Sequence, residues 1–309
     1  MTTSPASQSN ASVGDHPVRA EVATHTEPST RTTDQRRTRR ITLTGRNGAQ
    51  VAASLRDSGT GREVVFLHGL VGLNEHWEDV VDRINDRWRC RLLELPLLDL
   101  APADCSIEAV TELTASFLKV EVRRPVTLVG NSFGGHVALR IALDHPELCD
   151  ALVLAGASGL MERTLVRGAP VRPSRDWRSE KIGELFFNKD KMRDEDLERA
   201  FAALRARGGA RAMVRLSKTA RRDNLQRRLA EVAAPTLLIW GREDIVTPPA
   251  AAELFLENLP DARIAWIDRC GHAPMIESPE AFADAMLRFV DELDERDVRR
   301  AQRAGAEQP

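Results

Sequence analysis

The chain has 309 residues, of which 42% are hydrophobic and 29% are charged, and its formal net charge is −2. This length is enough to bury a core, and the nearly balanced charge is not typical of a nucleic-acid-binding protein. Apolar runs of about 18 residues are absent, which excludes a conventional transmembrane helix.

The four cysteines show neither paired ligand spacing nor a secretory context. We therefore expect free thiols in a reducing, cytoplasmic environment, and no metal site.

Residues 1–39 are predicted to form a disordered tail. They are rich in Ser, Thr, Pro and Ala, show no apolar periodicity and lead into the basic run RRTRR at 36–40. No apolar export segment follows Arg39 and Arg40, so a twin-arginine signal is not expected. Electrostatic contact of this tail with nucleic acid or a membrane is the less favoured alternative to a solvated tail.

From residue 40 onward, short apolar segments alternate with amphipathic helices. The segments with strand character are 39–45, 49–59, 63–69, 89–96, 126–130, 150–157, 234–244 and 262–272. Helical patterns occur at 77–86, at 106–120 behind a capping Ser106, after Ser132, and at 278–293. This alternation predicts an α/β fold, with a mostly parallel eight-stranded sheet and helices on both faces. We assign residues 40–158 and 231–294 to this core.

Residues 159–230 interrupt the alternation. They contain no clear strand, and helical patterns occur at 194–208 and 210–232. Between 161 and 230 there are 19 basic and 10 acidic residues, an excess that weakly favours anionic substrates. We interpret 159–230 as an inserted helical cap, and we expect the charged residues 295–309 to fray into a tail.

One serine lies between two glycines where a strand must turn into a helix. Gly130, Ser132 and Gly134 form a G-x-S-x-G pattern between the apolar segment VTLVG and a helical pattern that ends near Pro146. A turn this tight strains the serine and exposes its hydroxyl, and the glycines relieve the crowding. The context favours a nucleophile over an incidental serine in a glycine-rich turn.

A serine nucleophile needs a base, and the base needs an orienting carboxylate. Asp244 and His272 each follow a predicted strand, where their side chains would reach the carboxyl edge of the sheet. Taken singly, Asp244 could be a turn residue and His272 a loop histidine. The order Ser132, Asp244, His272 favours a triad in which they act as nucleophile, acid and base.

Acyl transfer also needs N–H groups to stabilise an oxyanion. We expect these donors to be the main-chain N–H groups of Phe133, directly after the serine, and of Leu70, in the loop after VVFLHG. His68 in that loop is the rival base, and we favour a structural role for it.

The four segments HGLVG, GNSFGG, GREDIVTP and GHAPMIESPE occur in the order of the oxyanion, nucleophile, acid and histidine loops of α/β-hydrolase-fold proteins. Over residues 40–293 the chain resembles that family. The resemblance implies the α/β-hydrolase fold and the same triad, Ser132, Asp244 and His272. It does not specify the substrate.

A serine at the elbow argues against the dehalogenase and epoxide hydrolase branches, which have aspartate there. The motifs are similar to those of small carboxylesterases and of meta-cleavage-product hydrolases, which cut carbon–carbon bonds in vinylogous diketones. The latter usually have a tryptophan after the histidine and an arginine in a cap helix; here Ala273 follows His272, and Ala200 rather than Arg199 aligns with the arginine. We therefore predict a serine esterase, with the carbon–carbon hydrolase as alternative and a non-catalytic ligand-binding protein as the alternative of another class.

The substrate is expected to be a small molecule, bound by Asn131, Phe187 and Met275 among apolar neighbours that include Leu185 and Phe186. We expect no cofactor and no nucleic-acid or membrane partner. Homo-oligomerisation is compatible with the sequence.

Overall fold

The computed structural model describes residues 37–162 and 175–306. The predicted tail therefore lies outside the described residues up to residue 36, as does the stretch 163–174 of the predicted cap. Within the described part, no helix combines the length and the apolar character needed to cross a bilayer. The four cysteines are buried free thiols.

All eight predicted strands are present and form one sheet, in the order β1-β2-β4-β3-β5-β6-β7-β8. The pairs β1–β2 and β2–β4 are antiparallel, and the other five pairs are parallel. The strands are β1 (Arg37–Thr44), β2 (Gln50–Ser58), β3 (Arg62–Leu67), β4 (Trp88–Glu94), β5 (Val126–Asn131), β6 (Cys149–Ala155), β7 (Thr236–Gly241) and β8 (Ala262–Ile267).

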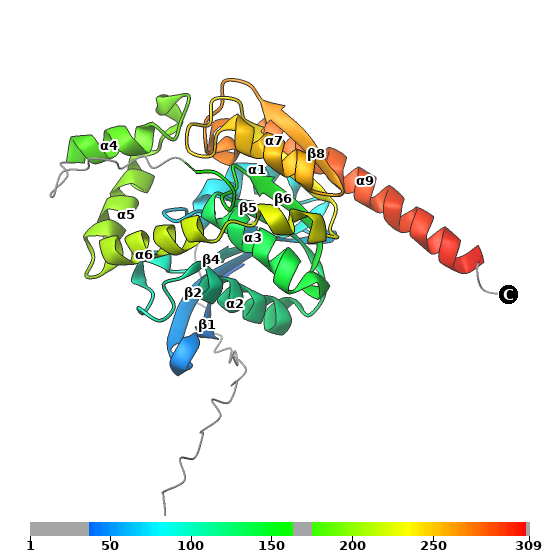
Figure 1. Cartoon of the computed structure of the whole chain (residues 1–309), viewed down its shortest axis with the longest axis horizontal. Helices are drawn as coiled ribbons and strands as arrows, with labels where there is room; N and C mark the ends of the chain where they lie inside the picture. Colours follow the sequence, from blue (N-terminus) through cyan, green and yellow to red (C-terminus); the bar gives the residue numbers. More distant parts are fainter. Residues whose placement is uncertain (1–36, 163–174, 307–309) are drawn as a thin grey trace, which may run out of the picture.

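Helices cover both faces of the sheet (Figure 1). On one face lie α2 (Ile107–Phe117), α3 (Phe133–Asp144) and α7 (Pro249–Asn258), and on the other lie α1 (Glu78–Ile84) and α9 (Pro279–Ala306). Successive side chains of a strand point to opposite faces, so neighbouring residues enter different cores. Val65 of β3, for example, packs with α2 and α3, whereas Val64 and Phe66 pack with α1 and α9. This two-layer burial explains why the central strands read as continuous apolar runs.

The register of the parallel strands aligns their carboxyl ends. Leu67 of β3 pairs with Gly130 of β5, and Asn131 at the end of β5 pairs with Ala155 of β6. The chain therefore leaves these strands at one edge of the sheet, where the predicted serine turn follows β5 directly. Loops from β3, β5, β7 and β8 can meet there.

The stretch 159–230, which the broken alternation marks as an insertion, lies between β6 and β7, and the structure describes its residues 159–162 and 175–230. Its described helices are α4 (Arg175–Gly183), α5 (Asp194–Arg205) and α6 (Gly209–Arg222), and Figure 1 shows them grouped to one side of the sheet. The helical patterns at 194–208 and 210–232 correspond to α5 and α6. The second pattern is shorter than predicted, because α6 ends at Arg222 and a short 3-10 helix (Gln226–Glu231) follows.

Two predicted boundaries and one omission need correction. The expectation that residues 295–309 fray is wrong as far as Ala306, because α9 continues to that residue and projects from the body of the protein (Figure 1). Arg62 forms ion pairs with Asp294, at 3.5 Å, and with Asp297, at 2.7 Å, and these contacts hold the middle of α9 against the body of the protein. The strand β1 begins at Arg37, within the predicted tail, because it pairs with β2 from that residue. Helix α7 was not predicted from the sequence.

Candidate active site

Ser132 lies in the sharp turn between β5 and α3. Its backbone has φ 54° and ψ −118°, in the left-handed half of conformational space that a residue with a side chain rarely adopts. A Cβ atom on Gly130 would lie 2.3 Å from the carbonyl oxygen of Gly134, and one on Gly134 would lie 2.2 Å from that of Leu67. Glycine is therefore required on both sides of the serine, which is the physical content of the G-x-S-x-G pattern.

Asp244 and His272 meet at the same edge of the sheet. Asp244 follows β7 and His272 follows β8, and Oδ2 of the aspartate lies 2.8 Å from Nδ1 of the histidine. Both side chains are buried. Burial acts to lower the pKa of His272, but the charge of Asp244 and the hydrogen bond with it raise the pKa above its ordinary value. The imidazole is therefore oriented through Nδ1, and its Nε2 is left free for chemistry.

Thr247 fixes the carboxylate of Asp244 and was missed in the sequence. Oδ1 of Asp244 accepts hydrogen bonds from the main-chain N–H groups of Val246, at 2.8 Å, and Thr247, at 3.0 Å. The Thr247 hydroxyl lies 2.8 Å from Oδ2 of Asp244 and 3.0 Å from the carbonyl oxygen of Gly156. The available signal was a threonine three residues after a turn aspartate, a spacing typical of local side-chain to backbone hydrogen bonds.

Asn131 holds the loop that carries the histidine. Its Nδ2 donates to the carbonyl oxygens of Ala155, at 3.0 Å, and His272, at 3.1 Å. The main-chain N–H of His272 donates to Leu185 of the insertion, at 2.7 Å. The histidine backbone is therefore tied both to the sheet and to the insertion. Asn131 lines the cavity described next, but its amide nitrogen is already used within the protein.

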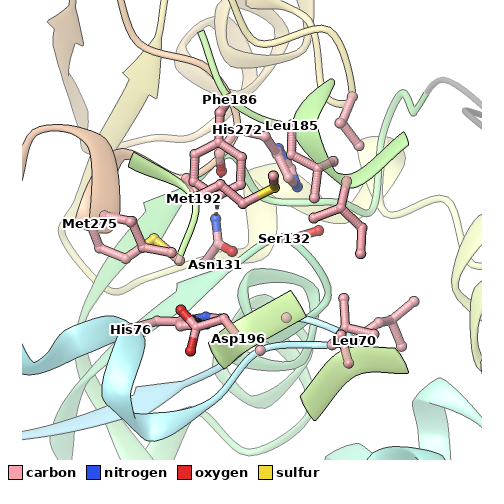
Figure 2. A pocket seen from close by; sticks show the side chains of 18 of the residues that line it. Leu70, His76, Asn131, Ser132, Leu185, Phe186, Met192, Asp196, His272 and Met275 are labelled. Carbon is pink, nitrogen blue, oxygen red and sulfur yellow. Dashed lines mark hydrogen bonds and ion pairs between the residues drawn. The ribbon is translucent and has the colours of Figure 1, made fainter. Parts of the chain in front are cut away.

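Ser132 and His272 both line one cavity of about 230 Å³ between the sheet edge and the insertion (Figure 2). The cavity is mainly apolar, and Leu70 and Met275 are among the residues that line it. The other lining residues are Gly69, Val71, Gly72, His76, Asn131, Ile182, Leu185, Phe186, Met192, Arg193, Asp196, Leu197, Ala200, Met213, Val246, Ala273 and Ile276.

Phe187, which the sequence assigned to the substrate pocket, does not line this cavity. Its side chain is 44% exposed and lies under the guanidinium of Arg269, 5.4 Å from the ring centroid. Phe186 faces the cavity instead. Adjacent side chains in this turn point to opposite sides, and the sequence had no periodic pattern there to decide which phenylalanine is inside.

Glu277 holds the turn that contains Phe186 and Phe187. Its carboxylate accepts hydrogen bonds from the main-chain N–H groups of Phe187, Asn188 and Gly271, at 2.8, 3.0 and 2.8 Å. Burial raises the pKa of Glu277 against the opposing effect of these donors. Glu277 is part of the segment GHAPMIESPE, where no local pattern indicated a role for it, and its contacts join the insertion to the histidine loop.

The two predicted oxyanion donors come from different parts of the chain, one directly after Ser132 and one in the loop after β3. Phe133 is the first residue of α3, and its side chain is buried in the core, so only its main chain can face the cavity. The N–H groups in the first turn of a helix have no partner within the helix, which leaves that of Phe133 available. Leu70 lines the cavity from the loop after β3.

His68 is held by main-chain contacts on both ring nitrogens. Its Nε2 accepts a hydrogen bond from the N–H of Leu95, at 3.1 Å, so the proton is on Nδ1, 2.7 Å from the carbonyl oxygen of Gly69. Burial lowers the pKa of His68. Both nitrogens are used to hold the loop, which argues against His68 as the base.

Arg199 does not line the cavity that holds Ser132. Its guanidinium lies 3.2 Å from Glu75 and 3.8 Å from Glu94, beside a neighbouring cavity of about 330 Å³. Ala200 lines both cavities. Across the described residues, no group of three or more His, Cys, Asp and Glu side chains could hold a metal ion.

The sequence is similar to that of a known protein family and to individual enzymes. Residues 64–285 match the model of the alpha/beta hydrolase family. The chain is 30% identical over 247 residues to pimeloyl-[acyl-carrier protein] methyl ester esterase of Nitrosomonas europaea, covering 73% of this chain and 94% of that protein. It is 26% identical over 272 residues to 2-hydroxy-6-oxononadienedioate/2-hydroxy-6-oxononatrienedioate hydrolase of Comamonas testosteroni, covering 81% and 95%.

Solved structures show the same fold. An alpha/beta hydrolase enzyme from the metagenome of lagoon sediments at Mar Chica, Morocco, has a TM-score of 0.61 and 30% identity over 78% of this chain and 96% of its own. The meta-cleavage product hydrolase of Pseudomonas fluorescens IP01 has a TM-score of 0.71 at 21% identity, over 82% and 97%. The family match over residues 64–285 contains most of β3, all of β4 to β8 and the candidate residues Ser132, Asp244 and His272. The chain belongs to the alpha/beta hydrolase family.

Proposed function

We propose that the protein is a serine esterase that cleaves carboxylic esters of small molecules through an acyl-enzyme, without a cofactor or metal. The observation that carries this proposal is the 2.8 Å contact between His272 Nδ1 and Asp244 Oδ2, beside a cavity that Ser132 and His272 both line. An oriented imidazole and a strained serine at one cavity are what nucleophilic acyl transfer requires.

In the proposed mechanism, Nε2 of His272 takes the proton of the Ser132 hydroxyl as its oxygen attacks the ester carbonyl. The main-chain N–H groups of Leu70 and Phe133 stabilise the oxyanion, each by about 3 to 4 kcal/mol. His272 then protonates the leaving alcohol, and the acyl group stays on Ser132. Water, deprotonated by the same imidazole, hydrolyses this ester. Asp244 holds the ring in the required tautomer and stabilises its protonated form.

Two observations favour ester over carbon–carbon cleavage. Ala273, next to the histidine, lines the cavity where the carbon–carbon enzymes usually have tryptophan. Arg199 is paired with Glu75 and Glu94 outside that cavity, so it is not placed to bind a substrate carboxylate there. The esterase relative supports the same choice at 30% identity. Helices of the stretch 159–230 contribute residues to the cavity. We assign this stretch the role of a cap that shapes the cavity.

The test is labelling of the full chain with a fluorophosphonate probe, read by intact mass, together with turnover of p-nitrophenyl esters of rising chain length. We expect one label, mapping to Ser132, and turnover of short esters. Ser132→Ala should lose both while its circular dichroism spectrum is retained. The matched control is Ser116→Ala, because Ser116 is buried and its hydroxyl has no hydrogen-bond partner among the described residues.

The alternatives give different results. Labelling at Ser132 without ester turnover, combined with hydrolysis of a vinylogous diketone, would assign the carbon–carbon reaction. A chain that is folded but neither labelled nor active would support the non-catalytic, ligand-binding alternative.

A further inference from the structure

The cavity beside Ser132 has one polar end. Its wall is otherwise built mainly from apolar side chains, such as Leu185, Phe186 and Met275. Figure 2 shows His76 and Asp196 together at the end of the cavity remote from His272. In this view Ser132 lies between His272 and this pair. A substrate whose carbonyl lies at Ser132 would therefore direct one of its ends toward His76 and Asp196.

His76 and Asp196 come from different parts of the chain. His76 belongs to a short 3-10 helix (Asn74–Trp77) after β3, and Asp196 belongs to α5 of the insertion. Nε2 of His76 lies 3.3 Å from Oδ2 of Asp196, at ion-pair distance but without the alignment of a hydrogen bond. Nδ1 of His76 is 3.4 Å from the main-chain N–H of Leu73, which leaves the proton of the neutral ring on Nε2.

The carboxylate of Asp196 has acceptor capacity to spare. Within the described part of the chain, His76 is the one side chain at ion-pair distance from it. Burial acts to raise the pKa of Asp196, but the contact with His76 and the charges of Arg193 and Arg199 lower it overall. The group is therefore ionised at neutral pH, half-buried, and placed on the wall of the cavity.

The net charge around the Asp196 end of the cavity is negative. Arg193 pairs with Asp79 at 3.0 Å, and Arg199 pairs with Glu75 at 3.2 Å and lies 3.8 Å from Glu94. Arg56 also lies 3.4 Å from Glu75 and pairs with Glu78. Three guanidinium groups thus face five carboxylates, that of Asp196 included. A substrate carboxylate at this end would meet net negative charge in a partly desolvated place, which is costly.

The basic excess of the insertion does not reach the cavity through α6. The cationic residues of this helix are all exposed: Arg211, Arg215, Lys218, Arg221 and Arg222. They follow the outer face of that helix, whereas Met213 on its inner side lines the cavity. Arg193 of the insertion does line the cavity, but its guanidinium is paired with Asp79 at 3.0 Å. The positions of these charges therefore give little support to the expectation that the basic excess favours anionic substrates.

We propose that Asp196, supported by His76, is a specificity residue that binds a hydrogen-bond donor, a hydroxyl or ammonium group, on the end of the substrate remote from the reacting carbonyl, and rejects a carboxylate there. This inference rests on the proposed esterase function and adds the substrate class to it. Asp196 accepts the hydrogen bond from the substrate, and His76 holds the carboxylate toward the cavity.

The test uses four p-nitrophenyl esters of trans-cyclohexanecarboxylic acid with different groups at carbon 4: ethyl, hydroxymethyl, aminomethyl and carboxy. The rigid ring keeps the remote group away from the carbonyl and prevents cyclisation. For the natural sequence we expect kcat/KM for the hydroxymethyl or aminomethyl ester to exceed that for the ethyl ester by about tenfold, and the carboxy ester to be the poorest.

The variant Asp196→Asn should bring the ratio of aminomethyl to ethyl kcat/KM down toward one. Asp190→Asn, which changes an exposed aspartate in a nearby 3-10 helix of the insertion, should leave that ratio unchanged. The ratio within each protein corrects for any general loss of activity, and the profile of the unmodified chain is decisive even if a variant folds poorly.

Turnover of the ethyl ester with no preference for the donor groups, or with the carboxy ester preferred, would overturn this inference and leave the esterase proposal intact. A folded chain that turns over none of the four esters and is not labelled at Ser132 would overturn both.

Discussion

Gly156 lies against His272 so closely that a Cβ on the glycine would be 3.1 Å from Nδ1 of the imidazole and 3.0 Å from Oδ2 of Asp244. Its φ of +49° is in the region that favours glycine, and its carbonyl oxygen accepts a hydrogen bond from Thr247. The main chain after β6 thus forms the wall behind the acid and the base. The absence of a side chain at this position lets the two groups approach each other.

Replacing that glycine should displace the pair. We expect Gly156→Ala to lower kcat/KM by about tenfold or more and to reduce stability by about 1 to 2 kcal/mol, because the new methyl group meets both side chains and the backbone is strained. Thermal unfolding and ester turnover measure the two effects. Gly48→Ala is the matched control, since Gly48 has φ +74° with nothing within 4 Å of the added Cβ. Equal activity losses in both variants would contradict the steric explanation.

The pH dependence of activity should report His272. The imidazole must be neutral to accept the proton of Ser132, so kcat/KM should rise with pH through a pKa above the ordinary value of 6.5. Asp244→Asn removes the charge that raises this pKa, so the acid limb should move to lower pH while kcat falls by about ten-thousandfold.

Asp268→Asn is the control for that experiment, because Asp268 is an exposed aspartate after β8 that pairs with Arg242. It should leave the acid limb in place. An acid limb centred below 6.5 in the unmodified chain would argue against Asp244 as the partner of the base.

Thr247 is expected to act as a positioning residue. Thr247→Val removes the hydroxyl, whose single proton is shared between Oδ2 of Asp244 and the carbonyl oxygen of Gly156, and it leaves these two acceptors without that donor. We expect about a tenfold loss of kcat and a loss of about 1 to 3 kcal/mol of stability. Thr247→Ser keeps the hydroxyl and should restore most of the activity. A serine variant as impaired as the valine variant would show that packing of the methyl group, and not the hydrogen bond, is what matters.

Glu277 should connect the stability of the insertion to that of the histidine loop. In Glu277→Gln, one carboxylate oxygen is replaced by an NH2 group, which cannot accept a hydrogen bond from the main-chain N–H that faces it, so about 1 to 3 kcal/mol of stability should be lost. Hydrogen exchange should become faster at residues 185–188 and at Gly271. Glu280→Gln changes an exposed glutamate three residues later and should alter neither. Unchanged exchange in the Glu277→Gln variant would show that other contacts hold the turn.

The fold and the pair Asp244–His272 could be anticipated because they follow from local rules. The different periods of strands and helices predict the elements, and the glycines around Ser132 mark the sharp turn. Parallel strands bring the loops that follow them to one edge of the sheet, which places Asp244 near His272. Phe187 could not be placed in this way, because its orientation depends on which main-chain N–H groups of the turn bond to Glu277. The roles of Thr247, Gly156 and Asp196 likewise depend on partners distant in sequence.

The sequence by itself determined the order of the strands along the chain, the strained serine turn and the candidate triad residues, since each depends on the spacing of neighbouring residues. The tertiary structure alone decided which side chains line the cavity and what charge they present. Most of the basic residues of α6 turn outward, and a carboxylate from α5 turns inward against His76. The physical reason is that burial and charge pairing are set by contacts between segments far apart in the chain, and no local pattern encodes them.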